Sequence, residues 1–296
     1  MPFVQVILDL GGRDPGAAED ACFAHGALSV TLADAADDPV LEPAPGTTPL
    51  WKDVRLTALF PAGVDGAALA GALGAGLGLP AAAVAVESVE DRPWEREWLR
   101  DFHPMRFGRR LWICPGGQAA PDPQALVLEL DPGLAFGTGT HPTTAACLEW
   151  LDGAVLAGRT VLDYGCGSGV LALAALRLGC ARACAVDIDP QALLATRENA
   201  ARNGLAPRLE VMAATELRGG PWDVVLANIL AGPLTALAPL LAGHTRTAGS
   251  IVLAGMLDAQ ADGVAAAYRP WFDMRVHARR EGWTVLTGQK RVPAAE

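Results

Sequence analysis

Lysine is almost missing from this chain: of its 296 residues, only Lys52 and Lys290 are lysines. We interpret the use of arginine in its place as a bias of genomic composition. Acidic residues outnumber basic ones by 33 to 23, and the formal net charge at pH 7 is −10. A protein that neutralises many phosphates is usually basic. This balance therefore disfavours direct binding of nucleic acid and suits a basic protein partner.

Cysteine motifs of metal sites are also missing. The six cysteines form no C-x-x-C pair, and no group of histidine and cysteine has the spacing of a metal site. We therefore expect no metal ion, and reduced thiols in a cytoplasmic protein. We also expect the protein to be a monomer. Cys166 lies among glycines, but no base stands beside it in the sequence, so we do not expect it to be a nucleophile.

Long apolar runs are scarce as well. The first residues, MPFVQVILDL, lack the basic segment of a signal peptide. Two uncharged stretches, residues 66–86 and 224–245, are interrupted by prolines, and the second also contains Asn228 and His244. Neither is apolar enough to cross a bilayer, so we expect no membrane partner.

The first ninety residues predict a small α+β domain. Their pattern gives the order strand, helix, strand, strand, helix, strand, with Asp14 and Asp65 as helix N-caps. This order is that of a ferredoxin-like fold. We assign residues 1–90 to a domain that binds or positions a substrate, with a purely structural role left open. Residues 91–106 are predicted to be a linker.

Residues 107–296 predict a second domain in which strands and helices alternate. The predicted elements include strands at residues 110–114, 125–130 and 250–256 and a helix over residues 232–242. Alternation of this kind favours a doubly wound parallel α/β sheet with helices on both faces, a Rossmann-like fold. The chain then changes pattern: residues 272–280 and 283–290 read as two strands joined by a turn at Glu281 and Gly282. A terminal antiparallel hairpin of this kind is typical of methyltransferases and is absent from dinucleotide-binding domains.

The segment VLDYGCGSG, residues 161–169, combines an apolar strand with Gly165, Gly167 and Gly169 at the start of a predicted helix. Such a loop lets a ligand approach the backbone and the helix N-terminus. A dinucleotide fingerprint would need a further glycine where this chain has Val170. The spacing instead resembles that of methyltransferases that use S-adenosylmethionine.

Three polar residues follow predicted strands close to this loop in the fold. Asp187 ends the strand ACAVD, where an acid reaches ribose hydroxyls, while Asp189 before Pro190 suits a helix N-cap. Asp163 either orders the glycine loop or reaches the cofactor through water. Asn228 ends a further strand, and the sequence after it lacks the Asn-Pro-Pro-aromatic motif of base N-methylases.

The loop at residues 130–144, LDPGLAFGTGTHPTT, completes a set of motifs with VLDYGCGSG, AVDID and NILAGPL. Together they resemble the family of ribosomal protein L-eleven methyltransferases (the PrmA family) over about residues 107–234. The resemblance implies S-adenosylmethionine contacts at Thr144, Gly165, Asp187 and Asn228. Phe136 and His141 are expected neighbours of cofactor or substrate. No acid follows the third strand, so adenine is expected to meet backbone groups or Glu216.

The resemblance also implies the reaction, which is methylation of amino groups on ribosomal protein L-eleven. Asn228 would then accept a hydrogen bond from the neutral amine and aim its lone pair at the methyl carbon. Two alternatives stay open: a methyltransferase of the same class acting on RNA or a small molecule, and a non-catalytic nucleotide-binding adaptor. A dehydrogenase is disfavoured by Val170 and by the terminal hairpin.

Overall fold

The computed structural model describes residues 3–36, 50–89, 103–130 and 141–292. The chain divides into two compact units, Met1–Glu95 and Arg96–Glu296. None of the helices in the described ranges is long and apolar enough to cross a membrane.

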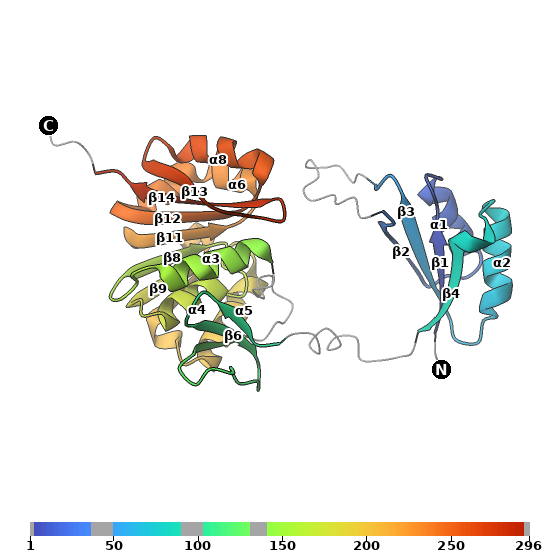
Figure 1. The fold of residues 1–296 in the computed structure, drawn as a ribbon, viewed down its shortest axis with the longest axis horizontal. Helices are drawn as coiled ribbons and strands as arrows, with labels where there is room; N and C mark the ends of the chain where they lie inside the picture. The colour runs from blue at the N-terminus through green and yellow to red at the C-terminus, as the bar shows by residue number, and fades with distance from the viewer. Residues whose placement is uncertain (1–2, 37–49, 90–102, 131–140, 293–296) are drawn as a thin grey trace. The chain divides into compact units, whose positions relative to one another are not determined.

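The first unit is a four-stranded antiparallel sheet with two helices, as predicted (Figure 1). Its strand order is β2-β3-β1-β4. Asp14 and Asp65 accept hydrogen bonds from backbone N–H groups of the first turns, which confirms both N-caps. The elements are β1 (Phe3–Asp9), α1 (Pro15–Ala24), β2 (Ser29–Asp34), β3 (Val54–Phe60), α2 (Gly66–Gly76) and β4 (Val84–Val89).

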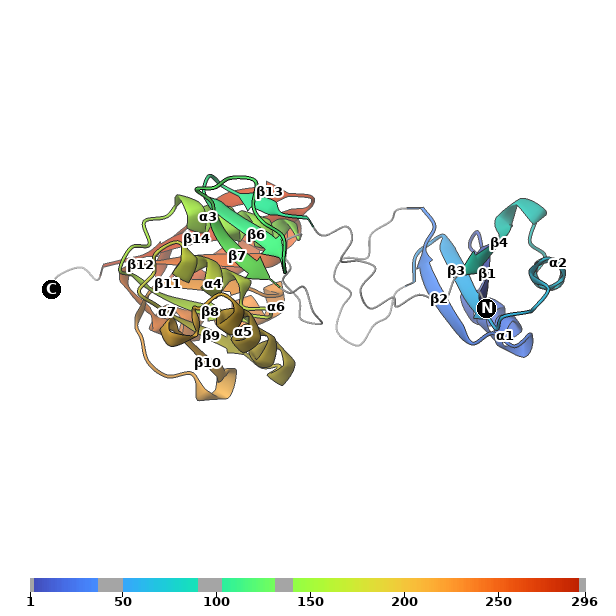
Figure 2. The same ribbon diagram turned by 90° about the horizontal axis from the view of Figure 1, so that it is seen from below.

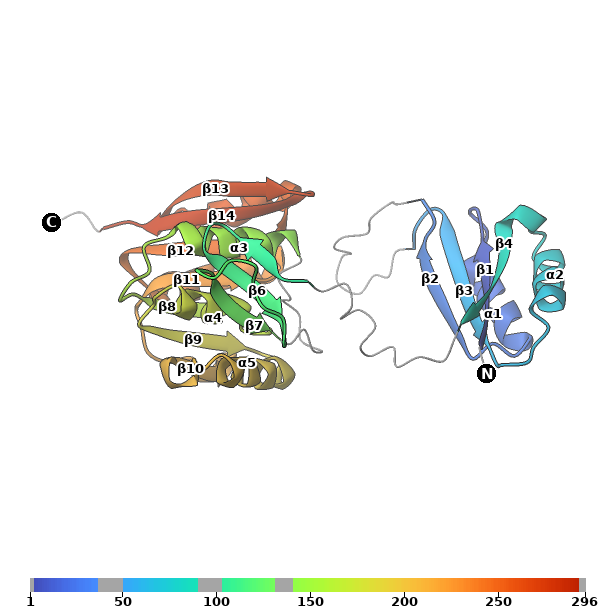
Figure 3. The same ribbon diagram turned by 60° about the horizontal axis from the view of Figure 1, so that its bottom comes forward.

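The second unit is built on a seven-stranded sheet of order β10-β9-β8-β11-β12-β14-β13 (Figure 3). The five strands from β10 to β12 in this order pair in parallel with their neighbours, and β14 runs antiparallel to both β12 and β13. This confirms the doubly wound sheet and its terminal hairpin. The strands are β8 (Thr160–Tyr164), β9 (Arg182–Asp187), β10 (Leu209–Ala213), β11 (Trp222–Asn228), β12 (Thr245–Leu257), β13 (Phe272–Arg280) and β14 (Trp283–Lys290).

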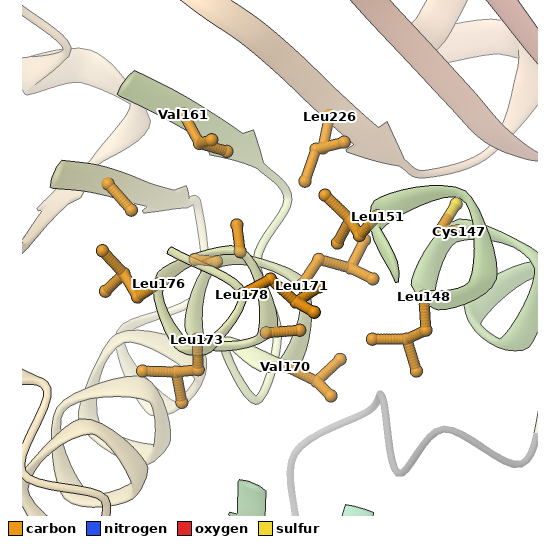
Figure 4. Close-up of a cluster of buried hydrophobic side chains, with 14 of the residues drawn as sticks. Cys147, Leu148, Leu151, Val161, Val170, Leu171, Leu173, Leu176, Leu178 and Leu226 are labelled. Carbon is orange, nitrogen blue, oxygen red and sulfur yellow. The ribbon is translucent and has the colours of Figure 1, made fainter. Parts of the chain in front are cut away.

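Six α-helices in the described part of this unit cover the two faces of the sheet, and separate apolar clusters lie on each side. One cluster includes α3, α4 and α5, and the other includes α6, α7 and α8. Helix α4 is buried along its length, because it contacts β8 and β9 of the sheet as well as α3 and β7 (Leu126–Leu130), and Leu171 points toward α3 (Figure 4). The helices are α3 (Pro142–Gly153), α4 (Val170–Arg177), α5 (Pro190–Arg202), α6 (Ala231–Ala236), α7 (Ala238–His244) and α8 (Ala261–Tyr268).

Three details differ from the sequence prediction. The strands predicted near residues 110–114 and 125–130 form a separate sheet with β5, which begins inside the predicted linker (Figure 2). The single helix predicted over residues 232–242 is divided into α6 and α7 at Leu237, and Pro239 lies in the first turn of α7, where proline favours a helix start. The strand predicted at 250–256 is longer. The extra sheet comprises β5 (Met105–Phe107), β6 (Leu111–Pro115) and β7 (Leu126–Leu130).

Candidate active site

A cavity of about 700 Å³ opens at the carboxyl ends of β8, β9 and β11. This is the end of a doubly wound sheet at which ligands bind, and the volume suits a small molecule. Its lining is mostly apolar with a few convergent polar groups. The lining residues are His141, Thr143, Tyr164, Gly165, Gly167, Asp187, Ile188, Asn228, Ile229, Leu230, Pro233, Leu237, Gly255 and Trp283.

The glycine loop forms one wall of this cavity. Gly165 and Gly167 line it, and both have the positive φ angles that favour glycine, +79° and +54°. A Cβ on Gly165 would collide with the side chain of Ile229. Gly169 is the N-cap of α4 and packs against Thr196, outside the described lining. The structure thus brings two of the three predicted glycines to the cavity.

Asp187 holds the loop from the end of β9. One carboxylate oxygen accepts a hydrogen bond from the Gly167 N–H at 2.9 Å, and the other accepts from the Asp189 N–H at 3.0 Å. Asp189 itself accepts from the Gln191 N–H at 2.9 Å, which confirms it as the N-cap of α5. Asp187 is only partly buried, so its carboxylate edge faces the cavity where ribose binding was predicted.

Asp163 lies one layer deeper and is about 1 % exposed. Its Oδ2 accepts a hydrogen bond from the Ala172 N–H in the first turn of α4 at 3.0 Å, so it orders this helix. Its Oδ1 has no hydrogen-bond partner within the described residues. Burial raises the pKa of Asp163 to about 7, against the effect of the Ala172 hydrogen bond, and the charge of Asp187 adds to the rise.

Asn228 and Thr144 are brought together although they are far apart in the sequence. The Asn228 Nδ2 donates to the Thr144 Oγ1 at 3.1 Å, joining the end of β11 to the start of α3. Asn228 lines the cavity, whereas Thr144 is about 1 % exposed and lies behind the described lining. Its neighbour Thr143 faces the cavity instead. A direct contact between Thr144 and the cofactor stays a prediction.

His141 caps α3 and packs against an aromatic residue that the sequence reasoning missed. Its Nδ1 lies 2.7 Å from the Thr143 Oγ1 and accepts from the Thr143 N–H at 3.3 Å. Its ring meets Trp283 edge to face, with centroids 4.9 Å apart and planes at 73°. Burial lowers the pKa of His141 below its usual 6.5, against the nearby charge of Glu281, so the ring is neutral at pH 7.

Other candidates lie elsewhere. Phe136 falls outside the described residues. Glu216 ends a short 3-10 helix after β10 and is not in the described lining. Cys166 is buried, its Sγ lies 3.4 Å from the Thr196 Oγ1, and burial raises the pKa of its thiol, so this thiol stays protonated. No cluster of metal-ligating side chains occurs in the described ranges.

Sequence reasoning also missed much of the apolar lining. Leu230 and Pro233 follow β11 in the segment NILAGPL that was singled out for its asparagine, and Leu237 comes soon after it. Their placement beside Asn228 could have been inferred from that segment. The placement of Trp283 could not have been inferred, because it depends on the pairing of β14 with β12, in which Trp283 stands opposite Leu257.

Comparison with known proteins matches nearly all of the chain. The family model "Ribosomal protein L11 methyltransferase (PrmA)" matches residues 3–291. A Pseudomonas aeruginosa (strain LESB58) protein named ribosomal protein L11 methyltransferase is 54% identical over 292 residues, covering 98% of this chain and 99% of its own. The Azotobacter vinelandii protein of the same name is 52% identical over 292 residues, covering 98% of this chain and 100% of its own.

A solved structure resembles part of the chain. The crystal structure of a ribosomal protein L11 methylase from Lactobacillus delbrueckii subsp. bulgaricus is 30% identical, with a TM-score of 0.60. The match covers 64% of this chain and 100% of that one.

Proposed function

Since this chain belongs to the ribosomal protein L11 methyltransferase (PrmA) family, we propose that it transfers methyl groups from S-adenosylmethionine to amino groups of ribosomal protein L11. The proposal rests on one observation: the chain shares more than half of its residues with proteins of that name, over nearly their full length. The cavity at the glycine loop gives the reaction a place.

The residues around the cavity fit S-adenosylmethionine, which supplies a methyl group made electrophilic by its sulfonium. Gly165 and Gly167 leave the loop backbone open, and a side chain at Gly165 has no room. Asp187 presents a carboxylate at the end of β9 for the ribose hydroxyls. The Asp187–Gly167 hydrogen bond fixes loop and carboxylate relative to each other before binding. Gly169, Thr144 and Phe136 are the further cofactor contacts that we propose.

Asn228 is the catalytic residue that we propose, because it stands where the methyl acceptor must approach. A lysine amine has a pKa of about 10.4, so removing its proton at pH 7 costs roughly 4–5 kcal/mol. Burial lowers that pKa. The Asn228 Nδ2 donates to Thr144, which leaves the amide oxygen to accept a hydrogen bond from the amine and orient its lone pair.

We propose that the ferredoxin-like unit recognises the ribosomal protein. Its described residues hold no counterpart of the glycine loop, and its four-stranded sheet has helices on one face. The net charge of −10 favours a basic protein over nucleic acid as partner. We propose that the enzyme acts in the cytoplasm as a monomer, and that the linker predicted over residues 91–106 ends where β5 begins at Met105.

The test is the intact mass of purified ribosomal protein L11 after incubation with the enzyme, with and without S-adenosylmethionine. We expect cofactor-dependent increments of one methyl group each. If the mass of ribosomal protein L11 stays constant while calorimetry shows that the cofactor binds, the assignment of the cofactor is kept and the proposed protein acceptor is wrong. RNA and small molecules would then be tried as acceptors.

A further inference from the structure

The two ends of the cavity differ in charge. Asp187, the one carboxylate in the described lining, stands at the glycine loop and is held there by the N–H groups of Gly167 and Asp189. Around Asn228 the described lining is mostly apolar or aromatic, with Leu230 and Trp283 among its members, and its polar groups there are those of Thr143 and His141. An acceptor amine that reaches Asn228 therefore meets no carboxylate of the described lining to accept its proton.

Trp283 is the largest side chain at this end, and three elements fix it. It is the first residue of β14 and stands opposite Leu257 of β12. The turn before it is tied down because the Asp258 N–H donates to the Gly282 carbonyl at 2.9 Å. The residue after it, Thr284, donates to the Asp258 carboxylate. Its ring rests against His141 at the start of α3.

Four ionisable groups of the described residues lie near the indole. Glu281 is in the turn before Trp283, and Asp258 accepts a hydrogen bond from Thr284. Arg280 stands opposite Trp283 on β13 and pairs with a glutamate of α3. Burial lowers the pKa of His141 below 6.5, so above pH 7 this ring adds no charge to the acceptor end of the cavity.

We propose that Trp283 is a positioning residue that keeps the acceptor end of the cavity dry, so that the substrate amine gives up its proton to solvent on binding. This inference rests on the proposed function. It adds that the substrate amine reacts in its neutral form. Excluding water from an ammonium disfavours its charged form, since no described carboxylate replaces the lost hydration. The acceptor it favours is an amine on a flexible aliphatic chain, which the indole packs against.

The reaction balances without a base in the protein. The amine loses its proton to solvent on entry and keeps its lone pair. That pair forms the new N–C bond, the C–S bond breaks, and its electrons stay on sulfur as a neutral thioether. The nitrogen becomes a methylammonium, which leaves with the product. Asn228 orients the nitrogen, and Trp283 sets its protonation state.

Isothermal calorimetry provides the test, with ribosomal protein L11 titrated at pH 8 into the enzyme saturated with S-adenosylhomocysteine. Repeating the titration in buffers of different ionisation enthalpy counts the protons released. We expect the wild type to release about one proton per complex, because a free amine with a pKa near 10.4 is almost fully protonated at pH 8. Trp283→Ala should release markedly less, and Trp283→Phe, which keeps an apolar ring, should behave like the wild type.

A second readout is the pH profile of kcat at saturating S-adenosylmethionine and saturating ribosomal protein L11, because kcat reports the groups that titrate in the bound complex. In Trp283→Ala the apparent pKa should move up by about one unit, which lowers the rate at pH 7 by about tenfold. Trp271→Ala is the matched control, because this tryptophan packs on the other face of the sheet. Its profile should equal that of the wild type, and thermal melts of all variants report folding.

The outcomes separate this inference from the proposed function. If the wild type methylates the ribosomal protein but binds it without releasing a proton, or if Trp283→Ala shares its proton count and pH profile, the role of Trp283 is wrong. If the wild type leaves the ribosomal protein unmodified while S-adenosylhomocysteine still binds, the proposed function fails first. Loss of folding in Trp283→Ala shifts the comparison to Trp283→Leu and Trp283→Gln. Leucine should keep the cavity dry and preserve proton release, whereas glutamine brings polar groups to the acceptor end and should release markedly less. Equal proton release by these two variants would contradict the role of Trp283.

Discussion

At the scale of single residues, Asn228 both lines the cavity and holds two elements of the fold together. Its side chain lines the cavity and also bonds to Thr144, which is buried at the start of α3. The sequence predicted that Asn228 lies at the ligand-binding end of the sheet, because ligands bind at the carboxyl ends of parallel strands near the switch point. Its partner could not be predicted, since the contact spans a sequence separation that no local pattern encodes.

Replacing Asn228 should affect turnover more than cofactor affinity. In Asn228→Ala we expect kcat to fall by roughly tenfold to a hundredfold, about 1.4–2.7 kcal/mol of transition-state free energy. The Kd for S-adenosylhomocysteine should change by less than about threefold, because the glycine loop and Asp187 are untouched. Single-turnover kinetics and calorimetry measure the two quantities. Wild-type turnover in this variant would remove Asn228 from the mechanism.

Asp163 should make stability depend on pH. Its folded pKa of about 7 lies above the value of about 3.9 for an unfolded aspartate. Between these values the folded protein keeps a proton that the unfolded chain has lost. The contribution of Asp163 to the free energy of unfolding therefore decreases as pH rises from about 4 to about 7, by at most about 4 kcal/mol.

The variant Asp163→Asn keeps an oxygen for the Ala172 N–H and cannot ionise. We expect urea denaturation to show that the wild type loses more stability between pH 5 and pH 8 than this variant. Equal losses in the two proteins would mean that Asp163 does not hold its proton in the folded state.

At the scale of elements, much of the fold could be predicted, because its signals are local. N-caps at Asp14, Asp65 and Asp189 mark helix starts, and each accepts the backbone hydrogen bond expected of a cap. The hairpin turn was located at Glu281 and Gly282, whose φ angles of +51° and +80° match a two-residue turn. The separate sheet of β5, β6 and β7 was missed, because strand partners are a tertiary property.

The glycine loop allows an element-scale prediction with a matched control. Gly165→Ala puts a side chain into Ile229 at a φ of +79°, so we expect cofactor affinity to fall by at least about tenfold, ~1.4 kcal/mol. Gly204→Ala imposes a similar positive φ of +66° with no heavy atom within 4 Å. It should reduce stability by about 1–2 kcal/mol and leave affinity unchanged. Calorimetry and urea denaturation distinguish the two effects, and equal affinities would argue against a packed loop.

At the scale of the whole molecule, each of the two units has buried clusters drawn from its own residues. Residues 96–296 produced alone should therefore fold and bind S-adenosylhomocysteine with the affinity of the full chain. Their kcat/KM for ribosomal protein L11 should fall by at least about tenfold, since the proposed recognition unit is missing, equivalent to ~1.4 kcal/mol. Undiminished kcat/KM would assign residues 1–95 a purely structural role.

The placement of β14 between β12 and β13 bears on how the molecule is made. Synthesis delivers β13 first, yet β13 reaches the sheet only through β14. The outer edge of β12 therefore stays unpaired until β14 has left the ribosome, and Trp283 arrives with that strand. A growing chain therefore acquires methyl transfer only after β14 has emerged. A nascent enzyme can hold most of its sheet before it can modify any protein, including those of the ribosome that is producing it.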